Sequence, residues 1–245
     1  MDTNPLEKLK GFFKEIFFPP FCLFCQKKLK DDDNKNLICS LCQKKIEINS
    51  GFFCPECGRR LYAPQKNCHL ETPFILAAVG SYQNEVLRFF IHALKYQQLK
   101  SSADVLASLI ILYLQKSKLG NFLKNKEFLV IPIPLHPRKK RQRGFNQSEL
   151  IAKKLIKKVN FSLFLETRAL IKIKNNAAQM EISNWKARKE NVKNCFAVKK
   201  PELIKGKNIL LLDDVFTSGA TMKEAVRVLK LSGAKKIIAL VIAKT

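Results

Sequence analysis

One thirteen-residue segment near the C-terminus constrains the fold more than any other part of the chain. Residues 209–221 read Ile-Leu-Leu-Leu-Asp-Asp-Val-Phe-Thr-Ser-Gly-Ala-Thr. The four apolar residues predict a strand that is buried on both faces of a parallel sheet. Asp213 and Asp214 follow where that strand is expected to end, and apolar residues at helical spacing begin at Met222. Strand, acidic pair, short loop and helix in this order predict an α/β domain.

The short loop in this segment combines hydroxyl groups with small residues. Its members are Thr217, Ser218, Gly219, Ala220 and Thr221. The amides of such a loop and the N-terminus of the next helix bind phosphate, and paired carboxylates accept hydrogen bonds from sugar hydroxyls. A plainer alternative is that the aspartates only cap the helix. The complete order favours a site for a phosphorylated sugar, at the sheet edge where open α/β folds bind ligands.

The segment closely resembles the signature of type I phosphoribosyltransferases, enzymes that use 5-phosphoribosyl-1-pyrophosphate (PRPP). The resemblance implies that Asp213 and Asp214 are the catalytic residues and hold the ribose 2′- and 3′-hydroxyls. It also implies that residues 217–221 surround the 5-phosphate and that Mg²⁺ binds with PRPP. Ser218 departs from the threonine found in many members, but it keeps a hydroxyl group on a small side chain.

Further strands and helices are predicted to alternate along the chain. Apolar patterns predict strands near 74–82, 127–135, 161–165, 207–213 and 235–243, and helices near 84–99, 102–116 and 146–159. This alternation predicts a doubly wound parallel sheet. The chain of 245 residues is long enough for one such domain, expected at 73–245, and a smaller N-terminal domain, expected at 1–72.

Seven of the eight cysteines lie in that smaller N-terminal part. Cys22-x-x-Cys25 and Cys39-x-x-Cys42 form two knuckles with the spacing of a tetrahedral, structural zinc site. Disulfides are not expected, because the chain shows no export signal. A polar segment of about 70 residues needs a stabilising metal site of this kind to fold beside the larger domain.

A third knuckle, Cys54-x-x-Cys57, is followed by Cys68. The cysteine that would complete a fourth knuckle is missing, because Glu71 stands at its position. A second zinc site therefore needs His69 or Glu71 as its fourth ligand, and otherwise the three thiols pack without metal. The spacing also leaves open an interleaved arrangement, in which the first and third knuckles share one ion.

A basic stretch follows the predicted strand at 127–135. Five cations fall between residues 138 and 143, and they include Arg138, Arg141 and Arg143. We expect a loop that binds pyrophosphate or a nucleic-acid backbone, with Phe145 stacking on a base, and the plainer alternative is a solvated basic loop without a ligand. Lys95, at the end of a predicted helix, is expected to help neutralise pyrophosphate.

Three short motifs complete a larger pattern. They are Pro132-Ile-Pro-Leu-His136, Arg143-Gly-Phe-Asn-Gln147, and Gln179 with Arg188 and Asn191. Together with the cysteine knuckles and residues 209–221, they resemble the ComF family of competence proteins over nearly the whole chain. The resemblance implies a double zinc ribbon followed by a type I phosphoribosyltransferase-like domain. It also implies a role in natural transformation, with single-stranded DNA and proteins of the DNA-uptake machinery as partners.

Composition bounds the location and the partners. A formal net charge of +25 is typical of proteins with polyanionic partners, although a lysine-rich coding bias accounts for it equally well. The N-terminus lacks the pattern of a signal peptide and the apolar runs are short, which predicts a cytoplasmic protein. Residues 4–18 are expected to form a basic amphipathic helix that packs on its own domain or contacts the inner face of the cytoplasmic membrane.

Two functions remain compatible with these patterns. The first is a phosphoribosyltransferase-fold protein that binds Mg·PRPP, whose acceptor no residue identifies. The second is a non-catalytic DNA-binding module whose phosphate pocket is regulatory or vestigial. Use of PRPP requires Asp213 and Asp214, whereas two carboxylates repel a DNA phosphate, so the acidic pair favours the first. A zinc-dependent interaction protein with a relic α/β domain is disfavoured, because a relic need not keep both carboxylates.

Overall fold

The computed structural model describes residues 21–30, 37–63, 67–69, 71–160, 162–175 and 192–245. The predicted helix at 4–18 and the motif residues Gln179, Arg188 and Asn191 lie outside the described residues. Within the described ranges, no helix is both long enough and apolar enough to cross a membrane.

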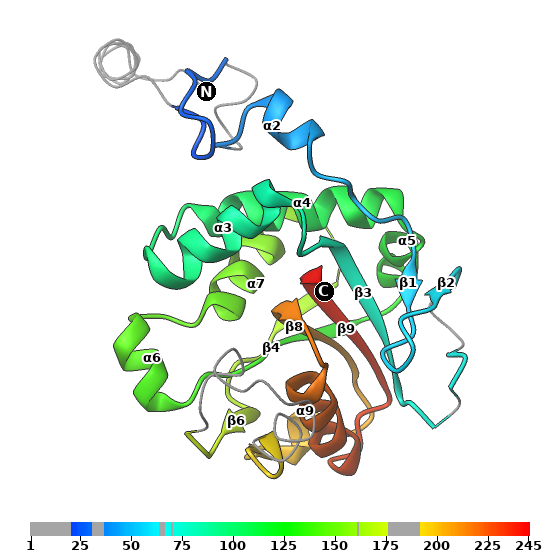
Figure 1. Cartoon of the computed structure of the whole chain (residues 1–245). Helices are drawn as coiled ribbons and strands as arrows, with labels where there is room; N and C mark the ends of the chain where they lie inside the picture. Colours follow the sequence, from blue (N-terminus) through cyan, green and yellow to red (C-terminus); the bar gives the residue numbers. More distant parts are fainter. Residues whose placement is uncertain (1–20, 31–36, 64–66, 70, 161, 176–191) are drawn as a thin grey trace, which may run out of the picture.

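A seven-stranded sheet forms the centre of the molecule, with the order β2-β1-β3-β9-β8-β4-β5 (Figure 1). Five neighbouring strands are parallel: β3 (Phe74–Ser81), β9 (Lys236–Lys244), β8 (Asn208–Phe216), β4 (Phe128–Pro132) and β5 (Leu163–Leu165). Two short antiparallel strands extend the β3 edge, β1 (Phe52–Phe53) and β2 (Arg60–Leu61). The prediction of a mainly parallel α/β sheet is confirmed.

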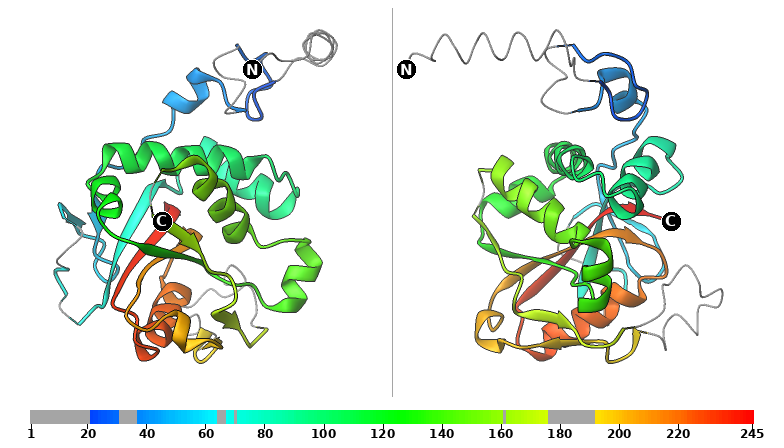
Figure 2. Two further views of the ribbon diagram at one scale, coloured as in Figure 1. Left: turned by 180° about the vertical axis from the view of Figure 1, so that it is seen from behind. Right: turned by 90° about the vertical axis from the view of Figure 1, so that its left-hand side faces the viewer.

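Helices lie on both faces of this sheet, as a doubly wound fold requires (Figures 1 and 2). One face carries α3 (Glu85–Tyr96), α4 (Ser102–Lys116), α5 (Leu119–Lys124) and α7 (Gln147–Lys158). The other face carries α9 (Ala220–Leu231) and a hairpin of β6 (Leu170–Lys172) with β7 (Phe196–Val198). The short elements α2 (Ser40–Lys44), α6 (Pro137–Arg143) and η2 (Pro201–Leu203) complete the described elements.

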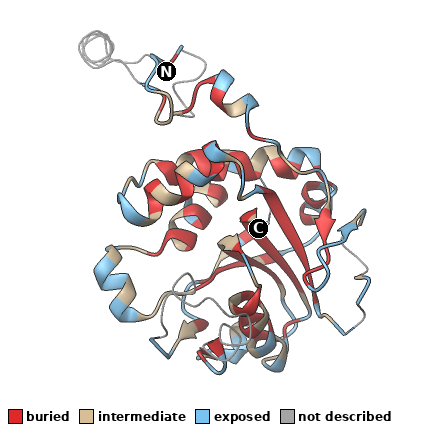
Figure 3. Ribbon diagram, in the orientation of Figure 1, coloured by how far each residue is buried: buried red, intermediate tan, exposed pale blue. Residues whose placement is uncertain are grey.

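Alternation along β8 explains why two separate cores form. Leu210 and Leu212 pack in the core beneath α3, α4 and α7, while Ile209 and Leu211 pack in the core beneath α9. All four are fully buried, and most of the central strands is buried (Figure 3). A strand covered on both faces needs apolar residues at every position, which is why residues 209–212 form one continuous apolar run.

The cysteine-rich part contacts the larger domain at several points. Phe24 packs edge-on against Phe89 of α3, with ring centroids 5.3 Å apart, and the Asn84 side chain donates to the carbonyl of Lys45 at 2.7 Å. Further along, β1 pairs directly with β3. The sheet therefore continues into the region predicted as a separate domain, and a boundary at residue 72 stays a prediction.

Candidate functional site

The site lies at the switch point of the sheet. β4 and β8 are neighbours, yet α7, which follows β4, packs on one face and α9, which follows β8, packs on the other. The N-termini of both helices therefore flank the crevice beyond the carboxyl ends of these two strands. Open α/β sheets bind their ligands in such crevices.

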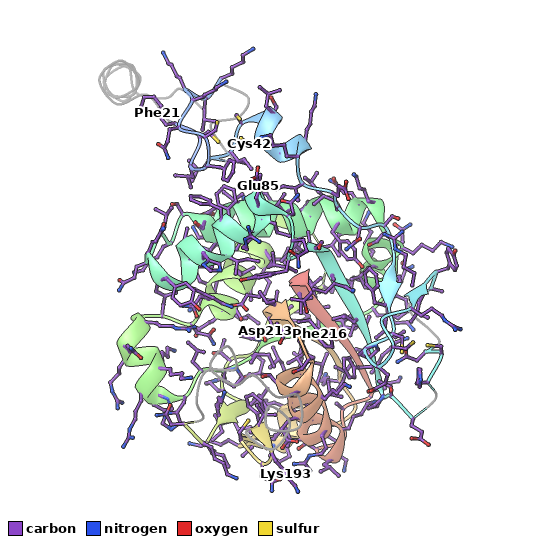
Figure 4. All side chains as sticks on the ribbon, in the orientation of Figure 1. Phe21, Cys42, Glu85, Lys193, Asp213 and Phe216 are labelled. Atoms are coloured by element: carbon purple, nitrogen blue, oxygen red, sulfur yellow. The ribbon has the colours of Figure 1, made fainter. Side chains whose placement is uncertain are left out.

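The acidic pair lies at this end of β8. β4 ends opposite Leu212, so Asp213 is the first residue of β8 beyond its β4 neighbour (Figure 4). β8 itself continues to Phe216 alongside β9, so the strand does not end at the aspartates as the sequence suggested. The acidic pair therefore lies on the part of β8 that extends beyond the end of β4.

Hydrogen bonds hold Asp213 in place. The hydroxyl of Ser148 donates to its Oδ1 at 3.0 Å, and the backbone N–H of Asp214 donates to the same oxygen at 2.9 Å. Ser148 is buried in the first turn of α7, whose cap residue Asn146 accepts from the Ser148 amide and donates to the carbonyl of Ile133. The cap thus positions the hydroxyl that orients the carboxylate.

Lys95 at the end of α3 completes the group. Its Nζ lies 2.7 Å from Asp214 Oδ1, with side chains only 18% and 13% exposed. Burial raises the pKa of Asp213 to about 7, and the neighbouring Asp214 carboxylate acts in the same direction, whereas Lys95 opposes it. Burial acts to lower the pKa of Lys95, but the two carboxylates outweigh it and raise that pKa above its usual value.

This raised pKa predicts an unusual pH dependence of stability. Between about pH 4 and pH 7 the folded protein keeps the Asp213 proton while the unfolded chain has lost it, so the free energy of unfolding falls as pH rises through this window. We expect Asp213→Asn to remove this contribution and flatten the profile relative to the wild type. Urea unfolding of both proteins at several pH values measures the difference, and parallel profiles would contradict the assignment.

The phosphate loop turns tightly after β8. Gly219 has φ +74°, and a Cβ at this position would lie 2.4 Å from the Phe216 ring, so glycine is required on both counts. The Ser218 hydroxyl accepts from the amide of Ala220 at 3.5 Å, at the start of the twelve-residue helix α9. Thr217 is exposed and Thr221 is half-buried. Phosphate binding by this loop stays a prediction.

The basic stretch is a helix, α6, and not the loop that the sequence suggested. Three local features start and end it. His136 caps its N-terminus by accepting from the Arg138 amide at 3.3 Å, Pro137 stands in the first turn, and Gly144 ends it with φ +77°. These caps outweigh the repulsion among five cations.

The contacts of α6 differ along its length. Arg143 donates to Gln147 Oε1 at 3.3 Å and lies over the ring of Tyr96, which follows Lys95 in α3. Arg138 and Arg141 are exposed on the outer side. Phe145 is half-buried against the core, with the Lys100 ammonium 5.5 Å from its ring centre.

The structure thus brings Lys95 to the acidic pair and Arg143 to Tyr96 at the end of α3, while Arg138 and Arg141 are exposed. Sequence reasoning missed Ser148, whose only local signal is its place in the first turn of a helix capped by Asn146. It also gave no role to Tyr96, an exposed tyrosine next to a predicted site lysine.

The first two knuckles form one four-sulfur group. The Sγ atoms of Cys22, Cys25, Cys39 and Cys42 all lie within 4.8 Å of one another. Those of Cys25 and Cys39 are 3.7 Å apart, and two thiolates on one tetrahedral zinc stand roughly 3.8 Å apart. The geometry fits a structural zinc ion, and three of the four residues are buried.

The third knuckle joins Cys68 and His69 in a second group. His69 Nδ1 lies 3.3 Å from the Cys54 sulfur, and the sulfurs of Cys57 and Cys68 are 3.4 Å apart. His69, and not Glu71, is therefore the fourth member of this group, and the first and third knuckles lie in separate groups. The set of three thiols and one imidazole suits a second structural zinc ion.

The two groups differ in exposure, which predicts different rates of metal loss. Three of the four ligands of the second group are exposed, whereas Cys22 and Cys42 of the first group are at most 4% exposed. We expect a chelator to remove zinc in two phases, the fast phase from the second group, followed with a colorimetric zinc indicator. Cys57→Ser/Cys68→Ser should lose only the fast phase, and loss of the slow phase would contradict the assignment.

The second group also contacts α9. Glu56, between two of its cysteines, forms an ion pair with Lys223 of α9 at 2.7 Å. A cavity of about 1100 Å³ lies beside this pair, lined by residues around His69 and by the flank of α9. This cavity is separate from the acidic pair, so it is not the crevice of the site.

Comparison with known proteins agrees with this architecture. A model of the double zinc ribbon domain matches residues 13–70, and a model of the phosphoribosyl transferase domain matches residues 146–245. Competence protein F of Haemophilus influenzae is 32% identical over 228 residues, which cover 90% of this chain and 95% of that protein.

Two more distant relatives extend the comparison. DNA utilization protein YhgH of Escherichia coli K12 is 27% identical, over 82% of this chain and 87% of that protein. Competence protein ComFC of Bacillus subtilis is 26% identical, over 85% of this chain and 88% of that protein. The chain therefore belongs to the ComF family of competence proteins, with an N-terminal double zinc ribbon and a phosphoribosyltransferase-type domain.

Proposed function

We propose that this protein binds Mg·PRPP in the crevice beyond β4 and β8, and that it handles single-stranded DNA in the cytoplasm during natural transformation. One observation carries the proposal: a buried carboxylate pair stands at the switch point of the sheet, next to a glycine turn that opens α9. Carboxylates there suit the hydroxyls of a sugar, and loop amides suit its phosphate.

Each group of residues has a part in this proposal. Oδ1 of Asp213 accepts hydrogen bonds from the Ser148 hydroxyl and the Asp214 amide, which leaves Oδ2 for a ribose hydroxyl. Lys95 neutralises Asp214 in the free protein and, with Arg143, supplies positive charge for the pyrophosphate. Mg²⁺, which prefers hard oxygen ligands, would neutralise the pyrophosphate further when PRPP is bound.

The DNA-binding part of the proposal is supported by the charge of α6 and by the relatives. α6 holds five cations in seven residues beside the crevice, and Arg138 and Arg141 point away from the core. The relatives are named for competence and for DNA utilization. Phosphate contacts from such cations supply affinity without reading sequence.

A non-catalytic, DNA-binding role is the second candidate, and one observation favours it. Asp214 already has a cation 2.7 Å away, so one of the two carboxylates is neutralised before any sugar arrives. In this alternative the phosphate loop is regulatory or vestigial and the α6 surface carries the function.

Calorimetric titration of PRPP into the zinc-loaded, full-length protein separates the two. We expect saturable binding with Mg²⁺ present and much weaker binding without it. Absence of binding under both conditions would overturn the PRPP proposal and leave the DNA-binding role.

A paired variant of α6 tests the DNA contact. Arg138→Ala/Arg141→Ala should weaken binding of a fluorescent single-stranded oligonucleotide and reduce the slope of log K against log salt by about 1.4, since each phosphate contact on a single strand contributes about 0.7. The control is Lys116→Ala/Lys118→Ala, which also removes two positive charges, but near α5 and away from α6 (Figure 1). Equal losses in the two variants would show that only net charge matters.

A further inference from the structure

An exposed aromatic ring stands beside the acidic pair. Tyr96 is 55% exposed, and it directly follows Lys95, whose ammonium contacts Asp214. Exposed tyrosines are common on protein surfaces, and position alone gives this one no role. Its surroundings are different, because groups on two sides hold the ring in place.

Two further ring side chains support Tyr96 from the sheet side. The His92 ring lies 5.3 Å from the Tyr96 ring, centre to centre, and His92 Nε2 is 2.8 Å from the hydroxyl of Tyr82. Tyr82 follows β3 and its amide donates to the carbonyl of Lys244 at 2.9 Å. The ring is therefore braced against the carboxyl edge of β3 and β9.

Arg143 at the end of α6 approaches the same ring. Its guanidinium carbon is 5.9 Å from the ring centre, and one of its nitrogens donates to Gln147 Oε1. Stacked bases are separated by about 3.4 Å, so two flat groups that sandwich one base stand roughly 7 Å apart. The guanidinium carbon is already 5.9 Å from the ring centre, and a small movement of the long arginine side chain would admit a base between the two groups.

Unpaired bases bind in this way, stacked on aromatic rings and on arginine guanidinium planes. We infer that Tyr96 and Arg143 clamp one unpaired nucleobase of single-stranded DNA beside the acidic pair. Phe145, for which the sequence suggested this role, is half-buried and already carries Lys100 over its ring. The inference rests on the DNA part of the proposed function and is independent of PRPP binding. The clamp requires an unpaired base, and the bases of a duplex are stacked and paired.

Abasic DNA tests the clamp, because it keeps the phosphates and removes the bases. Fluorescence anisotropy would compare a labelled oligonucleotide with an abasic one of equal length. We expect Tyr96→Ala to weaken binding of the normal strand by roughly 5- to 100-fold, the range for one stacked base, and to leave abasic binding unchanged. Tyr96→Phe should bind like the wild type.

Tyr62→Ala is the matched control, because Tyr62 is 89% exposed and follows β2 at the far edge of the sheet. If Tyr96→Ala binds the normal strand as tightly as the wild type, or loses equally on both strands, the clamp is wrong. If the wild type binds neither strand, the DNA part of the proposed function fails with it. A melting temperature of Tyr96→Ala equal to that of the wild type would show that any loss of binding is not a folding defect.

Discussion

Replacing both aspartates of the acidic pair, as Asp213→Asn/Asp214→Asn, is expected to reduce Mg·PRPP affinity by at least about 100-fold. Each carboxylate would accept a charge-assisted hydrogen bond from a ribose hydroxyl, and such bonds contribute about 1.5–3 kcal/mol each. An amide keeps the shape of the side chain but loses the charge. Calorimetric titration against the zinc-loaded wild type measures the difference.

Two further variants make this result interpretable. Asp213→Asn alone keeps the ion pair between Lys95 and Asp214, so it tests the site without leaving a buried cation unpaired. Asp104→Asn is a matched exchange elsewhere, at a carboxylate that contacts Lys154 at 2.8 Å on the helical face. If the double variant bound Mg·PRPP as tightly as Asp104→Asn, the acidic pair would have no part in binding.

The parts of this site that could be predicted from sequence are those encoded within a few residues. The apolar run before Asp213 reports a strand covered on both faces, and the glycine after it reports a turn with positive φ. The four-sulfur group follows from two knuckles whose spacing permits one tetrahedral ion. In each case a short pattern indicates the local geometry, although the pairing of the knuckles and the end of β8 come from the structure.

The remaining features depend on contacts between distant segments. Ser148 and Asp213 are separated by 65 residues, and only the packing of α7 and β8 at the switch point brings them together. The choice of His69 over Glu71 depends on how the chain returns after the third knuckle. The helix α6 was missed because five cations in seven residues give no amphipathic pattern, while the residues that cap it lie just outside the stretch.

The ion pair between Lys95 and Asp214 gives the second large effect. Lys95→Met is expected to lower the free energy of unfolding at pH 7.5 by about 3 kcal/mol, because it leaves two neighbouring carboxylates without the cation that contacts Asp214 and faces Asp213. Asp214→Asn should cost less, since Lys95 then still faces Asp213. Urea unfolding of the two single variants and of Lys95→Met/Asp214→Asn measures this cycle, with the double variant recovering part of the loss.

The same variants are expected to shift the pKa of Asp213 in opposite directions. Its pKa of about 7 should rise further in Lys95→Met, which removes the cation that opposes the shift, and fall in Asp214→Asn, which removes the neighbouring negative charge. The pH range over which stability falls should therefore extend upward in the first variant and contract in the second. A larger cost for Asp214→Asn than for Lys95→Met, or equal pH profiles in the two, would mean that Lys95 is held by packing and that its charge does not control the ionisation of the acidic pair.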